Sequence, residues 1–173
     1  MNTSEILVKM IHYSNGNLHD INHFMKVYGY AKTIAECERI PQDKRQITEI
    51  AAIVHDIACP LCREKYGNTN GTYQEAEGER LAREFLQDTG LSHEAIERIA
   101  FLVGHHHTPK DADGIDYQIL LEADYLVNAD ESAYSREHIE HTLNTMFQTS
   151  AGIELLKAVY SSRLSEKFGE KTR

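Results

Sequence analysis

The hydrophobic residues of this chain of 173 residues recur at helical spacing, and the alternation typical of strands is nearly absent. Turn and capping residues agree with this pattern: Gly16 separates the first two segments, Pro41 ends the second, and Ser92 and Ser135 are candidate N-caps. The sequence "TYQE" at 72–75 is typical of a capping box. We expect helices over residues 3–13, 17–39, 43–58, 72–89, 92–106, 116–130, 135–148 and 150–164. The sequence therefore predicts an all-α bundle of about 6–8 helices.

The length of the chain is enough for one domain with a real core and is short for two. We expect a single domain over residues 1–164, followed by a charged tail at 165–173 that frays. The longest segment expected to be irregular is 59–71. Loops that leave helices carrying unusual polar residues are where substrates usually enter, so this segment is a candidate pocket wall.

Composition excludes several classes of function. The net charge of −9 leaves no basic stripe for a nucleic-acid polymer, although it does not exclude a single nucleotide. No apolar run approaches the roughly 18 residues of a membrane span, and the first residues lack the pattern of a signal peptide. The three cysteines indicate a reducing compartment without a disulfide framework. We therefore expect a cytoplasmic protein with no membrane partner, and a homodimer is left open.

Ionisable residues interrupt apolar faces on three of the expected helices. His23 lies in an apolar stripe of the second helix, His55 and Asp56 end an apolar third helix, and Asp124 shares a face with leucines and a valine. An ionised Asp in such surroundings is costly unless a cation or strong donors meet it. Two imidazoles and two carboxylates suit Mn, Fe, Co, Ni or Zn, with Mg as a further candidate.

A structural role for these residues is the alternative. A single buried His is more often a hydrogen-bonded core residue, but four such residues on three helices argue against that explanation for all of them. The sequence "CPLC" at 59–62 has redox or half-zinc spacing, yet it lacks a second Cys pair and a βαβ context. His138 and His141 are expected at the surface. The sequence thus favours one divalent metal held by four residues.

These motifs resemble the HD-domain superfamily of metal-dependent phosphohydrolases, in particular its small bacterial hydrolases, over about residues 15–130. The family order is a His on one helix, a His-Asp pair on a later helix and a distant Asp. Here "HFMKVYGYA" supplies His23, "AAIVHDIA" supplies His55 and Asp56, and "ILLEADYLVN" supplies Asp124. The resemblance implies the HD-domain fold, with these four residues as the metal ligands.

Some members of the superfamily bind a second metal through further histidines, and the resemblance places those positions at Gln74 and in "GHHHTP". His106 matches the second position best and His105 is the next choice. Because a neutral amide is a weak ligand, we favour one tightly bound metal, with a second near Gln74 and His106 left open. We expect Gln74 and His105 to contact substrate, and His107 to be a cation at the end of a helix.

The resemblance implies that a metal-activated water attacks a phosphoester. We expect Asp56 to orient that water and His106 to donate a proton to the leaving oxygen. An acidic protein needs local positive charge to bind phosphate, and the candidates are Lys26, Arg63 and Lys65.

We therefore expect a metal-dependent phosphohydrolase, either a phosphomonoesterase or a phosphodiesterase or pyrophosphohydrolase. Its partner would be a small phosphorylated molecule, a nucleotide first of all. Two alternatives on the same scaffold are a non-catalytic nucleotide-binding module and a di-iron oxygenase. The oxygenase would need more histidine ligands than the amide of Gln74 permits.

Overall fold

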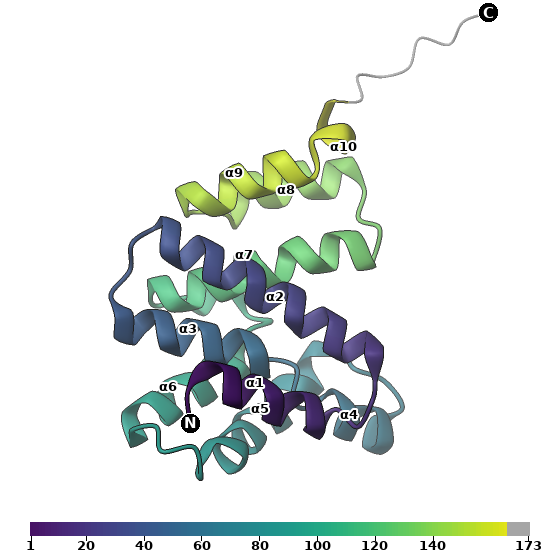
Figure 1. The fold of residues 1–173 in the computed structure, drawn as a ribbon. Coiled ribbons are helices and arrows are strands. Elements are labelled where there is room, and N and C mark those ends of the chain that lie inside the picture. Colours follow the sequence, from purple (N-terminus) through teal and green to yellow (C-terminus); the bar gives the residue numbers. More distant parts are fainter. Residues whose placement is uncertain (166–173) are drawn as a thin grey trace, which may run out of the picture.

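A computed structural model describes residues 1–165, and within them the chain forms helices joined by short connections, with no strand (Figure 1). Ser92 and Ser135 accept hydrogen bonds from the first turns of their helices, which confirms both predicted N-caps. The predicted frayed tail, 165–173, lies outside the described residues from 166 onward.

The helices are α1 (Thr3–Tyr13), α2 (Leu18–Cys37), α3 (Gln42–Val54), α4 (Cys59–Tyr66), α5 (Gly71–Leu86), α6 (His93–His105), the 3₁₀ helix η1 (Pro109–Asp111), α7 (Ile115–Glu131), α8 (Arg136–Thr145), α9 (Ser150–Val159) and α10 (Ser161–Ser165). The predicted all-α class is confirmed.

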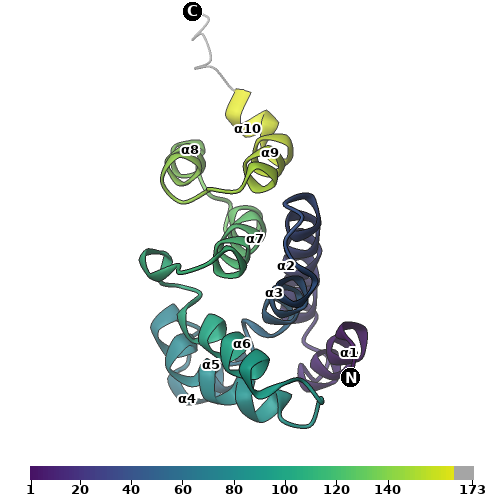
Figure 2. The same cartoon turned by 90° about the vertical axis from the view of Figure 1, so that its left-hand side faces the viewer.

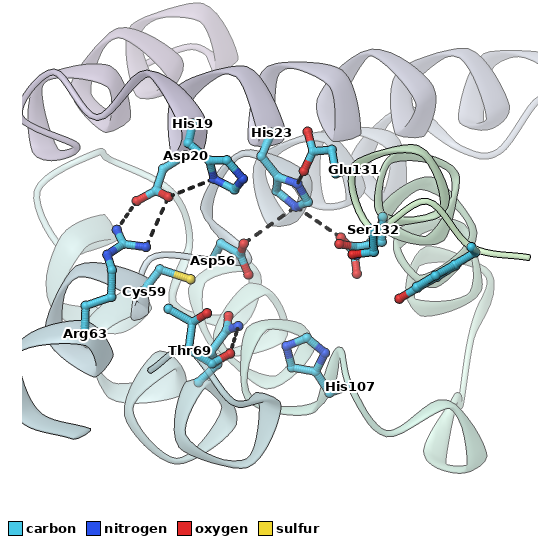
Figure 3. Close-up of a pocket in the computed structure, with 14 residues that line it drawn as sticks. His19, Asp20, His23, Asp56, Cys59, Arg63, Thr69, His107, Glu131 and Ser132 are labelled. Atoms are coloured by element: carbon cyan, nitrogen blue, oxygen red, sulfur yellow. Dashed lines mark hydrogen bonds and ion pairs between the residues drawn. The ribbon is translucent and has the colours of Figure 1, made fainter. Parts of the chain in front are cut away.

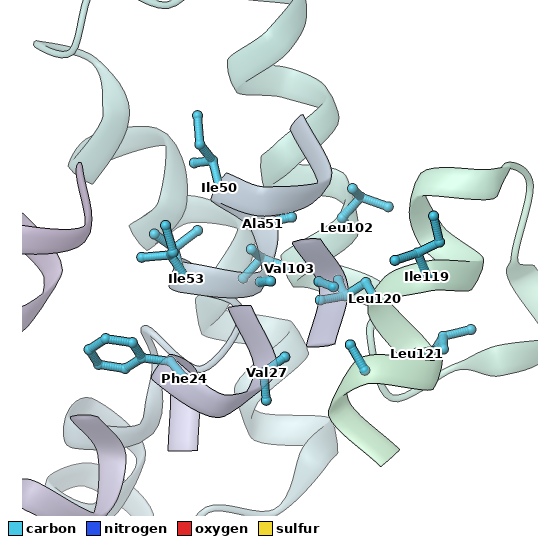
Figure 4. Packing of buried hydrophobic residues seen from close by; sticks show 14 of the residues in the cluster. Phe24, Val27, Ile50, Ala51, Ile53, Leu102, Val103, Ile119, Leu120 and Leu121 are labelled. Carbon is cyan, nitrogen blue, oxygen red and sulfur yellow. The ribbon is translucent and has the colours of Figure 1, made fainter. Parts of the chain in front are cut away.

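Helix α3 lies at the centre of the molecule. It packs against α1, α2, α6 and α7, and the two views show it between these layers (Figures 1 and 2). Its residues 50–54 are fully buried, and they pack against Phe24 and Val27 of α2 and Leu120 of α7 (Figure 4). The apolar run that predicts a buried central helix is therefore confirmed.

Helix α3 ends earlier than the sequence suggests. We expect it to continue to residue 58, but it stops at Val54 and a turn follows. The N–H of Ile57 donates to the Val54 carbonyl at 3.0 Å, a bond across three residues that tightens the chain. His55 and Asp56 consequently lie in a turn between two helices, and the prediction of one continuous helix is wrong.

The segment 59–71, which we expect to be irregular, contains the helix α4. Pro60 lies in the first turn of α4, where the missing N–H costs no helical hydrogen bond. Gly67 ends the helix with a positive φ of 71°, a conformation that favours glycine. The expected loop is therefore limited to the residues between α4 and α5.

The predicted capping box of α5 is also wrong. Asn70 is the N-cap instead, and its side chain accepts from the N–H of Thr72 at 3.0 Å. Glu75 is free to reach the loop after α6, where it accepts from the N–H of His107 at 3.0 Å. The residue expected to cap a helix thus positions a histidine.

Helices α5 and α6 approach closely because glycines lie at their contact. A Cβ on Gly78 would be 2.9 Å from Val103 Cγ1, and one on Gly104 would be 3.0 Å from Glu79 Cβ. This close packing brings the end of α6 to the side of the molecule where the turn after α3 lies.

Two buried carboxylates fix the position of α7. Asp116 in its first turn accepts from Arg98 of α6 through two bonds of 2.8 Å. Glu122, fully buried, accepts from the backbone N–H of Thr149 at 2.9 Å and so holds the start of α9.

Over residues 1–165, no helix combines the length and the apolar character needed to cross a membrane.

Replacing Gly78 with Ala tests the close contact of α5 and α6, with Gly29→Ala of α2 as the matched control. A Cβ on Gly29 would meet nothing within 4 Å, so helix propensity should raise its free energy of unfolding by about 0.5–1 kcal/mol. At Gly78, overpacking against Val103 should cost about 1–3 kcal/mol and cancel or exceed that gain. Chemical denaturation measures both variants, and equal changes would contradict the described contact.

Candidate metal centre

The four residues expected to bind metal lie together. His23 comes from α2, His55 and Asp56 from the turn after α3, and Asp124 from α7. The Nε2 atoms of His23 and His55 lie 3.2 and 3.4 Å from Asp124 Oδ1. Each of these nitrogens lies 3.6 Å from an oxygen of Asp56, and Figure 3 shows His23 and Asp56 facing each other. Three segments that are distant in the sequence therefore meet at one cluster.

The hydrogen bonds of the two imidazoles determine which nitrogen carries the proton. His55 Nδ1 lies 2.9 Å from the carbonyl of Ala52, which can only accept, so Nδ1 donates. His23 Nδ1 likewise donates to a carboxylate oxygen of Glu131 at 2.8 Å. Both Nε2 atoms are then left with lone pairs, yet they lie 3.1 Å apart. Two lone pairs at this distance repel each other unless a metal cation or a proton lies between them.

The geometry of the cluster fits a divalent transition metal. Ligand atoms at about 2.0–2.2 Å from one ion lie roughly 3.0–3.5 Å from one another, close to the separations in this cluster. Within the described chain, the buried Oδ1 of Asp124 has no hydrogen-bond partner, an arrangement that is costly unless a cation meets it. The mixed nitrogen and carboxylate donors suit Mn, Fe, Co, Ni or Zn.

The charges of the cluster also favour a bound cation. Burial opposes ionisation of Asp124, but the imidazoles of His23 and His55 outweigh it and hold the pKa of this carboxyl well below its usual range. Burial opposes protonation of His23, but the carboxylates of Asp124, Asp56 and Glu131 outweigh it and raise its pKa to about 9. A metal and a proton therefore compete for the same place.

Glu131 belongs to the site, although the sequence reasoning missed it. It is the last residue of α7, and its carboxylate connects His23 Nδ1 at 2.8 Å with Lys26 Nζ at 3.0 Å. Such a carboxylate fixes the orientation and tautomer of a ligating histidine. A signal for it was present, because Glu131 follows Asp124 by seven residues and so shares its helix face.

His106 and Gln74 lie beside the cluster, as the resemblance implies. His106 is buried, its Nδ1 lies 2.8 Å from the Val103 carbonyl, and its Nε2 lies 3.5 Å from Asp56 Oδ1. Gln74 donates from Nε2 to the carbonyl of Thr69 at 3.0 Å. In the described residues, His106 Nε2 and Gln74 Oε1 are buried without a hydrogen-bond partner. Both atoms are thus available to a ligand.

His105 and His107 lie in places opposite to those expected, because His107 and not His105 lines the cavity. His105 stacks on Phe101 and its Nδ1 lies 2.8 Å from the Phe101 carbonyl, so it does not reach the cluster. His107 lines the cavity, and its ligand atoms lie near those of Asp56 and His106. Desolvation and the neighbouring His106 lower the pKa of His107 to about 4. A lowered pKa disfavours a charged ring, which argues against the interpretation as a helix-end cation.

The loop that carries these histidines is held at two points. Thr108 Oγ1 donates to Glu75 at 2.9 Å, and Tyr117 donates from its hydroxyl to the Thr108 carbonyl at 2.9 Å. Tyr117 is fully buried in α7. The loop position is therefore determined by α5 and α7 together, and His106 and His107 are placed with it.

A cavity of about 320 Å³ opens beside the cluster (Figure 3). Of the three cations expected to bind phosphate, only Arg63 lines it, and its guanidinium is bound to Asp20 through both terminal nitrogens. Lys65 lies outside the cavity lining and pairs with Glu77 at 2.6 Å. Lys26 is likewise absent from the described lining, and it pairs with Glu131. Each expected phosphate ligand therefore already has a carboxylate partner.

Cys59 also lines the cavity, next to Asp56. Burial raises the pKa of its thiol, so it stays protonated and is a poor nucleophile or ligand. Cys62 is buried and free as well. We therefore interpret these two cysteines as residues that pack α4, and not as a redox site.

Comparisons with known proteins show the family of the chain and agree with its fold. The family model described as "HD domain" matches residues 20–133, which is more than half of the chain. A crystal structure of a predicted HD superfamily hydrolase from an uncultured Thermotogales bacterium is similar in fold, with a TM-score of 0.67 and 24% sequence identity. The similarity covers 92% of this chain and 85% of that one. No curated protein was found to match in sequence.

The ligand set predicts which histidines the metal requires. His55→Ala should weaken metal binding by more than about 100-fold, because even a change outside the ligand shell costs about 10–100-fold. His105→Ala is the matched control, since its ring is bound to Phe101 and does not reach the cluster. Elemental analysis and metal titration measure both variants. Full metal content in His55→Ala would contradict the site.

The competition between proton and metal predicts a pH dependence. The pKa of His23 is raised to about 9, so below this pH metal binding must release a proton. The apparent affinity for Mn²⁺ should then rise by about tenfold per pH unit between pH 7 and 8.5 and level off above pH 9. Calorimetric titration across this range measures it. An affinity that is flat or falls with rising pH would contradict the assignment.

Proposed function

Because the chain belongs to the HD-domain family, we propose that it is a metal-dependent phosphohydrolase acting on a nucleotide or another small phosphoester. The family match and the solved structure confirm the HD-domain fold, which places the chain in a superfamily of metal-dependent hydrolases. The observation that carries the proposal is the pair of imidazole Nε2 atoms 3.1 Å apart, beside two carboxylates and a cavity. We propose the phosphoester as substrate from this chemistry.

The cluster would hold the metal through the residues that the sequence predicts: His23, His55, Asp56 and Asp124. A divalent cation supplies Lewis-acid chemistry there, activating water as a nucleophile and withdrawing charge from a phosphoryl oxygen. Glu131 keeps the proton of His23 on Nδ1, so that Nε2 stays available as a ligand.

Asp56 is the carboxylate best placed to orient a water. Its side chain is 22% exposed, against 11% for Asp124, and it lines the cavity. His106 lies beside it, with Nε2 at 3.5 Å from Asp56 Oδ1 and Nδ1 at 2.8 Å from the Val103 carbonyl. An oriented carboxylate can accept a proton from the attacking water, which is the role we propose for Asp56.

The role expected for His106 as a proton donor changes in this arrangement. Its side chain is fully buried and is not among the described residues that line the cavity. We propose that His106 positions Asp56 instead of protonating the leaving oxygen. Lys26 acts in the same indirect way, through Glu131 and His23.

The alternatives have less support. A non-catalytic module would not need four intact ligands of which one, Asp56, opens to the cavity. A di-iron oxygenase would need a full second ligand set, and Gln74 contributes a neutral amide where a second histidine would serve better. We therefore propose one tightly bound metal per chain, which elemental analysis distinguishes from two irons.

Activity assays test the proposal. The purified protein, loaded with Mn, Co or Ni, should hydrolyse at least one member of a phosphoester panel. Asp124→Asn should lose at least about 100-fold in kcat/KM, because the carboxylate that faces both imidazoles is removed.

The matched control is Asp130→Asn, an exposed residue on the same helix, which should keep its activity within about twofold because surface changes are small. A panel that stays inert with every metal would contradict the phosphohydrolase proposal, as would full activity in Asp124→Asn.

A further inference from the structure

The charged groups around the cavity already balance one another. Of the described residues that line it, Arg63 alone carries a permanent positive charge, and Asp20 binds it with both carboxylate oxygens. That carboxylate raises the pKa of Arg63, as expected for a strong pair. Lys26, which is absent from the described lining, donates to Glu131 at 3.0 Å.

The two remaining carboxylates belong to the cluster. Asp56 and Asp124 together carry the charge that one divalent cation offsets. After that cation binds, neither Arg63 nor Lys26 is free to meet a further anion. A substrate with one phosphoryl group can use the cation itself, but a second or third phosphoryl group would bring charge that no paired residue neutralises.

Apart from the imidazoles of His19 and His107, the rest of the cavity wall offers mainly neutral polar groups. Thr69, Asn128, Ser132 and Tyr134 line it with hydroxyl and amide groups. Glu131 also lines the cavity, and its carboxylate is already bound to His23 and Lys26. The volume of about 320 Å³ lies at the small end of the range for ligand sites, about 300–1,000 Å³. Such a wall fits a compact molecule with hydroxyl groups, as in a sugar.

We propose that the cavity selects a monophosphate ester of a small hydroxyl-bearing compound, such as a nucleoside monophosphate, over di- and triphosphates. Asp20 determines this specificity because it holds the guanidinium of Arg63 away from incoming phosphoryl groups. This inference rests on the proposed phosphohydrolase function and names its substrate class.

The test compares the 5′-monophosphate and the 5′-triphosphate of one nucleoside, assayed with the Mn²⁺-loaded protein at the same free Mn²⁺ concentration. The kcat/KM of the wild type should favour the monophosphate by at least about tenfold, because like charges are costly in a site without spare cations. Asp20→Asn releases Arg63, so the preference should narrow by at least about fivefold.

The matched control is Asp88→Asn. It also removes one negative charge and one ion pair, that with Lys9, but it lies outside the cavity lining, so the preference should stay as in the wild type. A triphosphate hydrolysed as well as the monophosphate would overturn this inference and leave the phosphohydrolase function standing. An unchanged preference in Asp20→Asn would overturn the role of Asp20. If neither compound nor any other phosphoester were hydrolysed, the proposed function would fail, and this inference with it.

Discussion

The close approach of two imidazole Nε2 atoms, held 3.1 Å apart, is the constraint on which the site depends, because only a proton or a metal cation can lie between them without repulsion. His55 is fixed by a backbone carbonyl and His23 by Glu131, so neither ring can turn its N–H toward the other. Asp56 and Asp124 add negative charge to the same place. A cation would relieve both the repulsion between the two nitrogens and the repulsion between the two carboxylates. It would also join α2, the turn after α3, and α7.

The surrounding helices keep this arrangement in place. The close contact at Gly78 brings α6 against α5, while Glu75 and Tyr117 hold the loop after α6. His106 and His107 are thereby placed beside Asp56, and the ring of His106 also lies against that of His55. The fold thus supports the cluster from segments that contribute no ligand of the predicted set.

Sequence patterns predicted the parts of the site that depend on helix faces. His23 and Asp124 stand out because they interrupt apolar stripes, and Glu131 could have been found by the same periodicity. The end of α3 at Val54 could not have been predicted by periodicity, because the apolar run continues through the turn to residue 58. That turn is set by hydrogen bonds across three residues, which hydrophobic periodicity does not record.

The partners of the basic residues were not predictable, because they depend on tertiary contacts. Arg63 binds Asp20 across 43 positions of sequence, and Lys26 binds Glu131 across 105. A search for positive charge therefore identified basic residues near the site without their pairing. In the folded chain those pairs leave a cavity whose anion-binding capacity depends on the metal.

The most direct test of the central claim is a crystal structure of the Mn²⁺-loaded protein with anomalous diffraction recorded at the metal edge. We predict one strong anomalous peak within coordination distance of the Nε2 atoms of His23 and His55 and of oxygens from Asp56 and Asp124. A protein that binds Mn²⁺ with no peak among these four side chains would contradict the account.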